Sequence, residues 1–130
     1  MSQAREKARS FLRQVGFPDD TLEKLLVALG EGCTNSIRHS YGNQPQGRIE
    51  ITLEDFKDKV VIKIRDFGEK IDFSKVKEPE LPPKKPHGLG LYFIKTIMDQ
   101  FEYNTSHTLG NELIMIKYKS AKEKPHENQD

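Results

Sequence analysis

Residues 48–68 read RIEITLEDFKDKVVIKIRDFG and predict two adjacent β-strands. Apolar residues alternate with polar ones in Arg48–Leu53 and again in Lys59–Arg65, which is the period of a strand with one buried face. The intervening EDFKD suits a hairpin turn. These residues therefore predict an antiparallel pair whose apolar face needs cover.

Helical periodicity precedes this pair of strands. Residues 3–15 carry apolar side chains at helical spacing, and GFPDD then breaks the pattern, with Asp19 or Asp20 placed to cap the next helix. From Thr21 one apolar stripe continues until Tyr41-Gly42-Asn43 ends it. The members of the stripe are Leu22, Leu25, Leu26, Leu29, Cys33 and Ile37.

The remainder predicts a loop, a third helix and a second hairpin. Residues 72–87 hold four of the seven prolines and show no periodicity, so we expect a loop. A helix is expected over residues 89–101, and its apolar face consists of Leu91, Ile94, Met98 and Phe101. EYNTSH (102–107) and ELIMIKY (112–118) predict a closing hairpin. This order predicts an α+β two-layer sandwich with a mixed, mostly antiparallel sheet covered on one face by helices.

Composition limits the class of protein. The 130 residues suit one domain, which we expect over residues 1–119, followed by a disordered polar tail over residues 120–130. The 21 Lys and Arg against 20 Asp and Glu argue against a nucleic-acid binder. The single cysteine, Cys33, excludes an internal disulfide. No apolar run is long enough to span a membrane and no signal peptide follows Met1, so we expect a cytoplasmic protein.

The long helix carries polar residues opposite its apolar stripe. At about 100° per residue, Glu31 and Asn35 lie one turn apart on that face. Small residues flank them and would leave room for a ligand, namely Ala28, Gly32 and Ser36. A solvated outer face explains the same pattern. Glycines at positions 30 and 32 cost about 1 kcal/mol each relative to alanine, and this favours a packing or ligand-approach reason for them.

A second group of polar residues lies where an apolar strand ends. Asp66 can accept hydrogen bonds from an exocyclic amine there, and Gly68 lets a flat ligand approach the backbone. An ordinary turn explains both residues equally well.

A third group opens the last helix, in HGLGLYFIKTIMDQF (87–101). Gly88 and Gly90 expose unpaired N–H groups at a helix start, where the helix dipole favours an anion. Positive charge lies just upstream, on Lys84, Lys85 and His87. A plain helix entry beside a basic loop explains this segment alone, and neither a P-loop nor a dinucleotide fingerprint is present.

Together and in this order, the three segments resemble the ATP-binding motifs of the GHKL superfamily, which includes gyrase-type and histidine-kinase ATPase domains. Within it the chain is most similar to the small anti-sigma factor serine kinases of bacteria. EGCTNSIRHSYG resembles their N-box, IRDFGEKIDF their first glycine box and HGLGLYFIKTIMDQFEY their second. The resemblance covers roughly residues 8–118.

The resemblance implies roles for the matching residues. Glu31 would be the general base toward a protein hydroxyl, and Asn35 would be the side-chain ligand of Mg²⁺. Asp66 would bind the adenine amino group, with Gly68 giving the ring close access. Residues 72–87 would form the ATP lid. The backbone N–H groups facing the phosphates would be those of Gly88, Leu89, Gly90 and Leu91. Two further residues of the implied nucleotide site are His39, which a surface position explains as well, and Lys85.

The implied activity is transfer of the ATP γ-phosphate to a Ser or Thr of an anti-sigma factor antagonist, by a protein that also binds a sigma factor. ATP and Mg²⁺ are the implied cofactors. We expect no direct nucleic-acid or membrane partner. Both a monomer and a homodimer are compatible with the sequence. One alternative is a nucleotide-binding module that holds its partner without phosphoryl transfer, although retention of Glu31 favours the enzyme. Another is a detached ATPase domain of a sensor histidine kinase, which the short lid and Ile71-Asp72-Phe73 disfavour.

Some positions depart from the family pattern. Lys70 stands where a small residue is usual, so it would alter the rim of the adenine pocket or bring a cation to the nucleotide. Gly110 is followed by Asn111 and Glu112, where a Thr often joins the adenine hydrogen-bond network. The family usually has a strand before its first helix, whereas this sequence begins within or just ahead of that helix. These departures weaken the expectation of kinase activity more than that of ATP binding.

Overall fold

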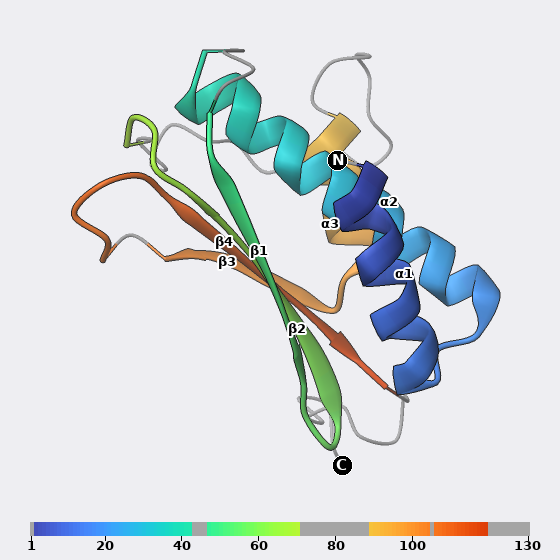
Figure 1. Cartoon of the computed structure of the whole chain (residues 1–130). Coiled ribbons are helices and arrows are strands. Elements are labelled where there is room, and N and C mark those ends of the chain that lie inside the picture. Colours follow the sequence, from blue (N-terminus) through green and yellow to red (C-terminus); the bar gives the residue numbers. More distant parts are fainter. Residues whose placement is uncertain (1, 43–46, 71–88, 105, 120–130) are drawn as a thin grey trace.

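The computed structural model describes residues 2–42, 47–70, 89–104 and 106–119. The elements in chain order are α1 (Ser2–Val15), α2 (Asp19–Ser40), β1 (Ile49–Asp55), β2 (Lys59–Asp66), α3 (Leu89–Ile97), β3 (Gln100–Asn104) and β4 (Glu112–Tyr118). The strands form one sheet in the order β1-β2-β4-β3, and each neighbouring pair is antiparallel. The helices lie together on one face of this sheet (Figure 1). The predicted α+β class is therefore confirmed, with only antiparallel pairs among the described strands. The expected lid and C-terminal tail lie outside the described residues.

The alternating patterns of the strands meet on the face that the helices cover. Ile64 of β2 pairs with Ile51 of β1 on one side and with Leu113 of β4 on the other. Two residues away, Ile62 pairs in the same way with Leu53 and Met115. Because side chains two apart share a face, these rows form a continuous apolar surface.

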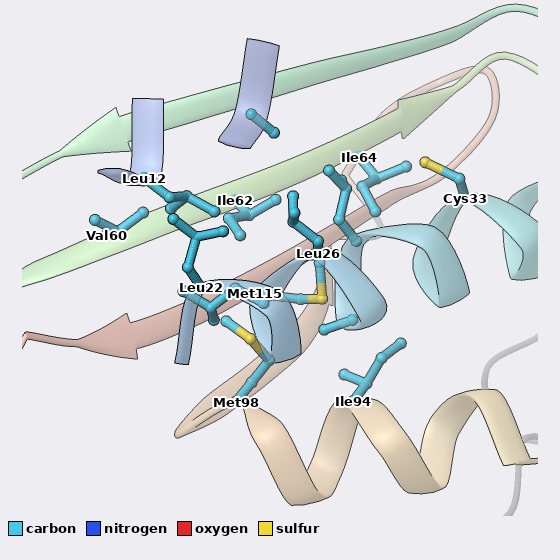
Figure 2. Packing of buried hydrophobic residues seen from close by; sticks show 14 of the residues in the cluster. Leu12, Leu22, Leu26, Cys33, Val60, Ile62, Ile64, Ile94, Met98 and Met115 are labelled. Carbon is cyan, nitrogen blue, oxygen red and sulfur yellow. The ribbon is translucent and has the colours of Figure 1, made fainter. Parts of the chain in front are cut away.

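The long helix α2 packs against its neighbours α1 and α3 and against β2 of the sheet. Figure 2 shows Leu22 and Leu26 of α2 beside Ile62 and Met115 of the sheet, with Ile94 on the side of α3. All five side chains are buried. The stripe read from the sequence thus belongs to the core of the domain from Leu22 to Cys33, whereas Ile37 is half-buried and lies outside it. Removal of this apolar surface from water is the main stabilising term.

The small residues of α2 contact protein and leave no room for a ligand. Ala28, Gly32 and Ser36 are all buried. A Cβ atom at Gly32 would lie 2.4 Å from Ile64 Cδ1 and 3.2 Å from Leu113 Cδ2. Close packing of the helix on the sheet therefore explains the glycine, and the expectation that these residues make room for a ligand is wrong.

The start of α2 also differs from expectation. The N-cap residue is Pro18, which provides no side-chain cap, and its carbonyl accepts the Leu22 N–H at 2.8 Å. Asp19 and Asp20 lie inside the first turn, so neither is the cap. Their negative charges instead interact favourably with the positive end of the helix dipole.

The third helix is shorter than the predicted range 89–101, because the chain that follows it pairs with β4. Helix α3 ends at Ile97, where the Lys117 ammonium donates to the Ile97 carbonyl at 2.8 Å. The Asp99 N–H then donates to the Ile116 carbonyl at 3.0 Å. Phe101, expected on the helix face, lies in β3, which accordingly begins at Gln100 and not at residue 102.

Burial of Cys33 yields a chemical test of the packing. Loss of solvation raises the pKa of the Cys33 thiol to about 11. At pH 8 roughly one thiol in a thousand is then ionised, and only the thiolate is a good nucleophile. We expect alkylation by iodoacetamide to be at least about a hundredfold slower in the native protein than in urea, as followed by mass spectrometry. Equal rates would contradict this packing.

None of the described helices has the length and apolar character needed to cross a membrane.

Candidate functional site

A pocket of about 490 Å³ lies between the end of α2 and the loop that follows β2. Its lining residues are Ser40, Tyr41, Gly42, Phe67, Gly68, Glu69 and Leu109. Two hydrogen bonds fasten the loop to the helix end: the Glu69 N–H donates to the Ser40 carbonyl at 2.8 Å, and the Phe67 N–H donates to the Tyr41 hydroxyl at 2.7 Å. The pocket is therefore built from segments that are distant in the sequence.

The carboxylate of Asp66 lies behind this pocket and is held by protein donors. Asp66 is only 1% exposed. Its Oδ2 accepts a hydrogen bond from the Ser40 hydroxyl at 2.8 Å. Its Oδ1 accepts from the Gly68 N–H at 3.2 Å and from both the backbone and the side-chain amide of Asn111 at 3.1 Å. A carboxylate anchored on both oxygens has one orientation.

Asn111 connects Asp66 to the walls of the pocket. Besides Asp66 Oδ1, its side-chain nitrogen lies 2.9 Å from Ser40 Oγ and 2.8 Å from the Glu69 carbonyl oxygen, so its two N–H groups are shared among three acceptors. Asn111 is 2% exposed, so these bonds form away from water. Asn111 stands where the family often has a Thr, and it thus belongs to the Asp66 network.

Ser40 was missed by the sequence analysis, although a signal was present. It falls at helical spacing after Leu29, Cys33 and Ser36, all of which are buried. A hydroxyl that continues a buried stripe needs a partner, and Asp66 provides it.

Two glycines permit the close approach of these segments. A Cβ at Gly68 would lie 2.3 Å from the Ser40 carbonyl oxygen. Gly110 has φ +75°, and a Cβ there would lie 2.1 Å from the Asp66 carbonyl oxygen. Gly68 is thus explained by packing against α2, and it also lines the pocket.

Three predicted site residues lie on successive turns of α2 that lead to the pocket. Glu31 and Asn35 are half-buried and His39, next to Ser40, is exposed. Spacing of four residues places them along one side of the helix. Among the described residues, no cluster of three or more His, Cys, Asp or Glu side chains is present. Asn35 therefore fits Mg²⁺ only in a shell completed by phosphate and water oxygens, which this ion accepts.

The predicted phosphate-binding segment is described only in part. Leu89, Gly90 and Leu91 form the first turn of α3, which packs against α2. The side chain of Leu91 packs against the core, which leaves its backbone as the group available to a ligand. Lys85 and Gly88 lie outside the described residues.

Lys70 joins the rim of the pocket to the β3–β4 connection. Its ammonium group donates to the His107 carbonyl at 2.7 Å. Leu109, in the same connection, is 57% exposed and lines the pocket. The sequence predicted that Lys70 either alters the rim of the adenine pocket or brings a cation to the nucleotide. This hydrogen bond supports the altered rim.

A charged cluster around Glu112 joins the end of β3 and the start of β4 to this connection. Its Oε1 lies 3.0 Å from His107 Nε2 and accepts the Asn104 side-chain amide at 3.0 Å. Burial raises the pKa of Glu112, but the hydrogen bonds from His107 and Asn104, with the charges of His107 and Lys63, outweigh it and lower the pKa below 4.5.

This cluster predicts a pH-dependent contribution to stability. A folded-state pKa below the unfolded value gives stability that is present above the unfolded value and lost as the pH falls through the folded one. We therefore expect Glu112→Gln to destabilise the domain at pH 7 and to match the wild type once the pH is well below 4.5. Urea unfolding at several pH values measures this difference. A difference that stays constant from neutral to acid pH would contradict the assignment.

The family model described as a histidine kinase-like ATPase domain matches residues 1–117. A serine-protein kinase RsbW of Oceanobacillus iheyensis is 33% identical over 118 residues, which are 85% of this chain and 73% of the relative. The RsbW of Bacillus subtilis is 30% identical over 123 residues, which are 88% of this chain and 75% of the relative. Among solved structures, the catalytic domain of histidine kinase ThkA has a TM-score of 0.61 at 21% identity, covering 79% of this chain and 70% of that one.

The solved structure supports the fold, and the family model and the RsbW relatives extend over nearly all of the described residues. The resemblance to the GHKL superfamily that the sequence motifs indicated is thereby confirmed. The chain belongs to the family of histidine kinase-like ATPase domains.

Proposed function

We propose that this chain is an ATP-dependent protein kinase of the anti-sigma factor type, which transfers the γ-phosphate of ATP to a Ser or Thr of an antagonist protein. Membership of an ATPase family implies ATP as the nucleotide. Three relatives are 29–33% identical to this chain over 85–88% of its length, and each is named serine-protein kinase. The observation that carries the proposal is the placement of Glu31 and Asn35 on the helix whose end forms the pocket.

The pocket supports one orientation of the nucleotide. Asp66 lies behind the pocket, and its carboxylate is joined by hydrogen bonds to Ser40 and Gly68 of the lining. A carboxylate suits an exocyclic amine, so adenine occupies the end beside Gly68. The phosphates then extend toward the first turn of α3, where free N–H groups favour an anion. The backbone groups proposed for this role belong to Gly88, Leu89, Gly90 and Leu91. Lys85 adds positive charge to the phosphate side, His39 provides a ring nitrogen there, and residues 72–87 form the lid.

Glu31 and Asn35, on the outer face of α2, have different roles in the reaction. Asn35 contributes one oxygen to Mg²⁺, which neutralises phosphate charge when bound. Glu31 accepts the proton of the attacking hydroxyl as the new oxygen–phosphorus bond forms and the bond to the ADP oxygen breaks. Their separation of one helical turn keeps the base beside the ion without making it a ligand.

The proposal includes a sigma factor as the protein that the domain sequesters, the antagonist as its substrate, and the cytoplasm as its location. Neither nucleic acid nor membrane is a direct partner. A homodimer is compatible with the two edge strands of the sheet, β1 and β3.

Incubation with γ-labelled ATP, Mg²⁺ and a candidate antagonist tests the proposal. Label on the antagonist supports the kinase. Saturable ATP binding without label on any antagonist would refute the kinase and favour the non-catalytic module. A chain that does not bind ATP would refute both.

A further inference from the structure

The β3–β4 connection contributes one wall of the pocket through Leu109. This side chain is apolar and 57% exposed. A ligand that covers it removes apolar surface from water, which favours the occupied pocket. The benefit depends on where the connection holds Leu109, so the groups that fasten the connection also act on the pocket.

Side chains, rather than backbone pairing, fasten the part of this connection that the structure describes. The β3–β4 ladder ends at the pair Asn104 and Glu112. Among the described residues, no backbone–backbone hydrogen bond involves residues 106–110. Such bonds resume at Asn111, whose N–H donates to the Asp66 carbonyl at 3.3 Å. The connection is therefore fixed by its backbone only at its far end.

The side-chain anchors of the near end meet at His107, two residues before Leu109. The His107 carbonyl accepts a hydrogen bond from the Lys70 ammonium group at 2.7 Å. Its ring Nε2 lies 3.0 Å from Glu112 Oε1, which the Asn104 amide also holds at 3.0 Å. Lys70 follows β2 and Glu112 begins β4. Two separate parts of the sheet thus hold one residue of the wall.

We propose that Lys70 and His107 are positioning residues, whose anchors keep Leu109 at the rim of the pocket and thereby set how long a nucleotide stays bound. This inference rests on the proposed nucleotide-binding function and deepens it by assigning a control of release. A wall that is already held loses little conformational entropy when a ligand arrives. Without the anchors binding has to supply that order, and the complex dissociates faster.

Lys70→Met tests the first anchor, because methionine keeps part of the aliphatic stem and removes the ammonium donor. We expect ADP labelled on its ribose with an N-methylanthraniloyl fluorophore to leave this variant about two- to fivefold faster than the wild type, the range for one exposed hydrogen bond. Lys70→Arg retains a donor and is expected to restore most of the difference. His107→Phe, which removes the bond to Glu112, is expected to act in the same direction as Lys70→Met. Stopped-flow chase with excess unlabelled ADP gives the rates.

A double-mutant cycle separates an effect through Leu109 from direct contact of Lys70 with the nucleotide. Leu109→Ala alone is expected to speed release about three- to tenfold, because apolar cover is lost. In that background, Lys70→Met is expected to add less than about a factor of two. If Lys70→Met instead keeps its full effect there, Lys70 acts on the nucleotide itself and the proposal is overturned.

Lys119→Met is the matched control. The Lys119 ammonium group binds the Asp55 carboxylate at 2.7 Å, and Lys119 does not line the pocket. This variant should release labelled ADP at the wild-type rate. A readout without nucleotide is the set of NMR order parameters of the backbone of residues 106–110, which we expect to fall in Lys70→Met and to stay unchanged in Lys119→Met.

The outcomes separate this inference from the function on which it rests. A wild type that binds neither ATP nor labelled ADP would refute the proposed function. A wild type that binds ADP, with a Lys70→Met variant that releases it at the wild-type rate, would refute the anchors alone. Order parameters that are equal in Lys70→Met and the wild type would do the same.

Discussion

Glu31→Gln is expected to lower the rate of phosphoryl transfer to the antagonist by about 10²–10⁴-fold. The substitution keeps the size and hydrogen-bonding shape of the side chain and removes the group that accepts the proton of the attacking hydroxyl. ATP affinity is expected to stay within about twofold, because the adenine contacts and the Mg²⁺ ligand are on other residues. Single-turnover transfer of γ-label, beside equilibrium binding of ATP, measures both quantities.

Glu102→Gln is the matched control for this change. Glu102 is exposed on β3, opposite Ile114 in the sheet, and does not line the pocket. Its variant should transfer phosphate at the wild-type rate. Equal rates of phosphoryl transfer for the Glu31 variant and the wild type would show that Glu31 does not act as the base.

Gly110→Ala is expected to reduce the free energy of unfolding by about 3 kcal/mol or more. The residue has φ +75°, and the added methyl group would lie 2.1 Å from the Asp66 carbonyl oxygen and 2.7 Å from Phe67 Cα. Both contacts are with backbone, which cannot move without breaking the pairing of Asp66 with Asn111. Small domains have about 5–15 kcal/mol of stability, so the loss is a large part of the total.

Gly42→Ala separates backbone strain from collision. Gly42 also has positive φ, at +57°, but a Cβ there would meet nothing within 4 Å. Its cost is therefore expected to be only that of the left-handed conformation, about 1 kcal/mol. Urea unfolding of the two variants gives the comparison. Equal losses would show that the backbone contacts of Gly110 do not matter.

The parts of the fold that the sequence predicted are those with a long, regular pattern. The stripe from Leu22 to Cys33 and the alternations in β2 and β4 correspond to buried faces, and the alternation in β1 corresponds to a partly buried face packed against the core. Errors arose where a contact distant in the sequence decides the local structure. Asp99 pairs with β4 and ends the third helix early, and no pattern within residues 89–101 contains that information.

The candidate site shows the same division. Glu31 and Asp66 were predicted as site residues from the sequence because their spacing matches a family pattern. Ser40 was missed and Asn111 was taken only as a departure, since their importance comes from hydrogen bonds across 26 and 45 residues of chain. The contacts of the Phe67 ring with Arg48 and Arg65, whose guanidinium carbons lie 4.8 and 4.4 Å from the ring centroid, also join residues that are distant in the sequence or adjacent on the strand end and were not predicted.

Relatives that match most of this chain are named serine-protein kinase, so the identity of the phosphorylated residue is the decisive observation. Mass spectrometric mapping of phosphate after incubation of the full chain with ATP, Mg²⁺ and an antagonist determines it. We predict phosphate on a Ser or Thr hydroxyl of the antagonist, formed by the wild type and absent with Glu31→Gln. Phosphate on a histidine, or transfer that persists in the Glu31 variant, would contradict the proposed kinase.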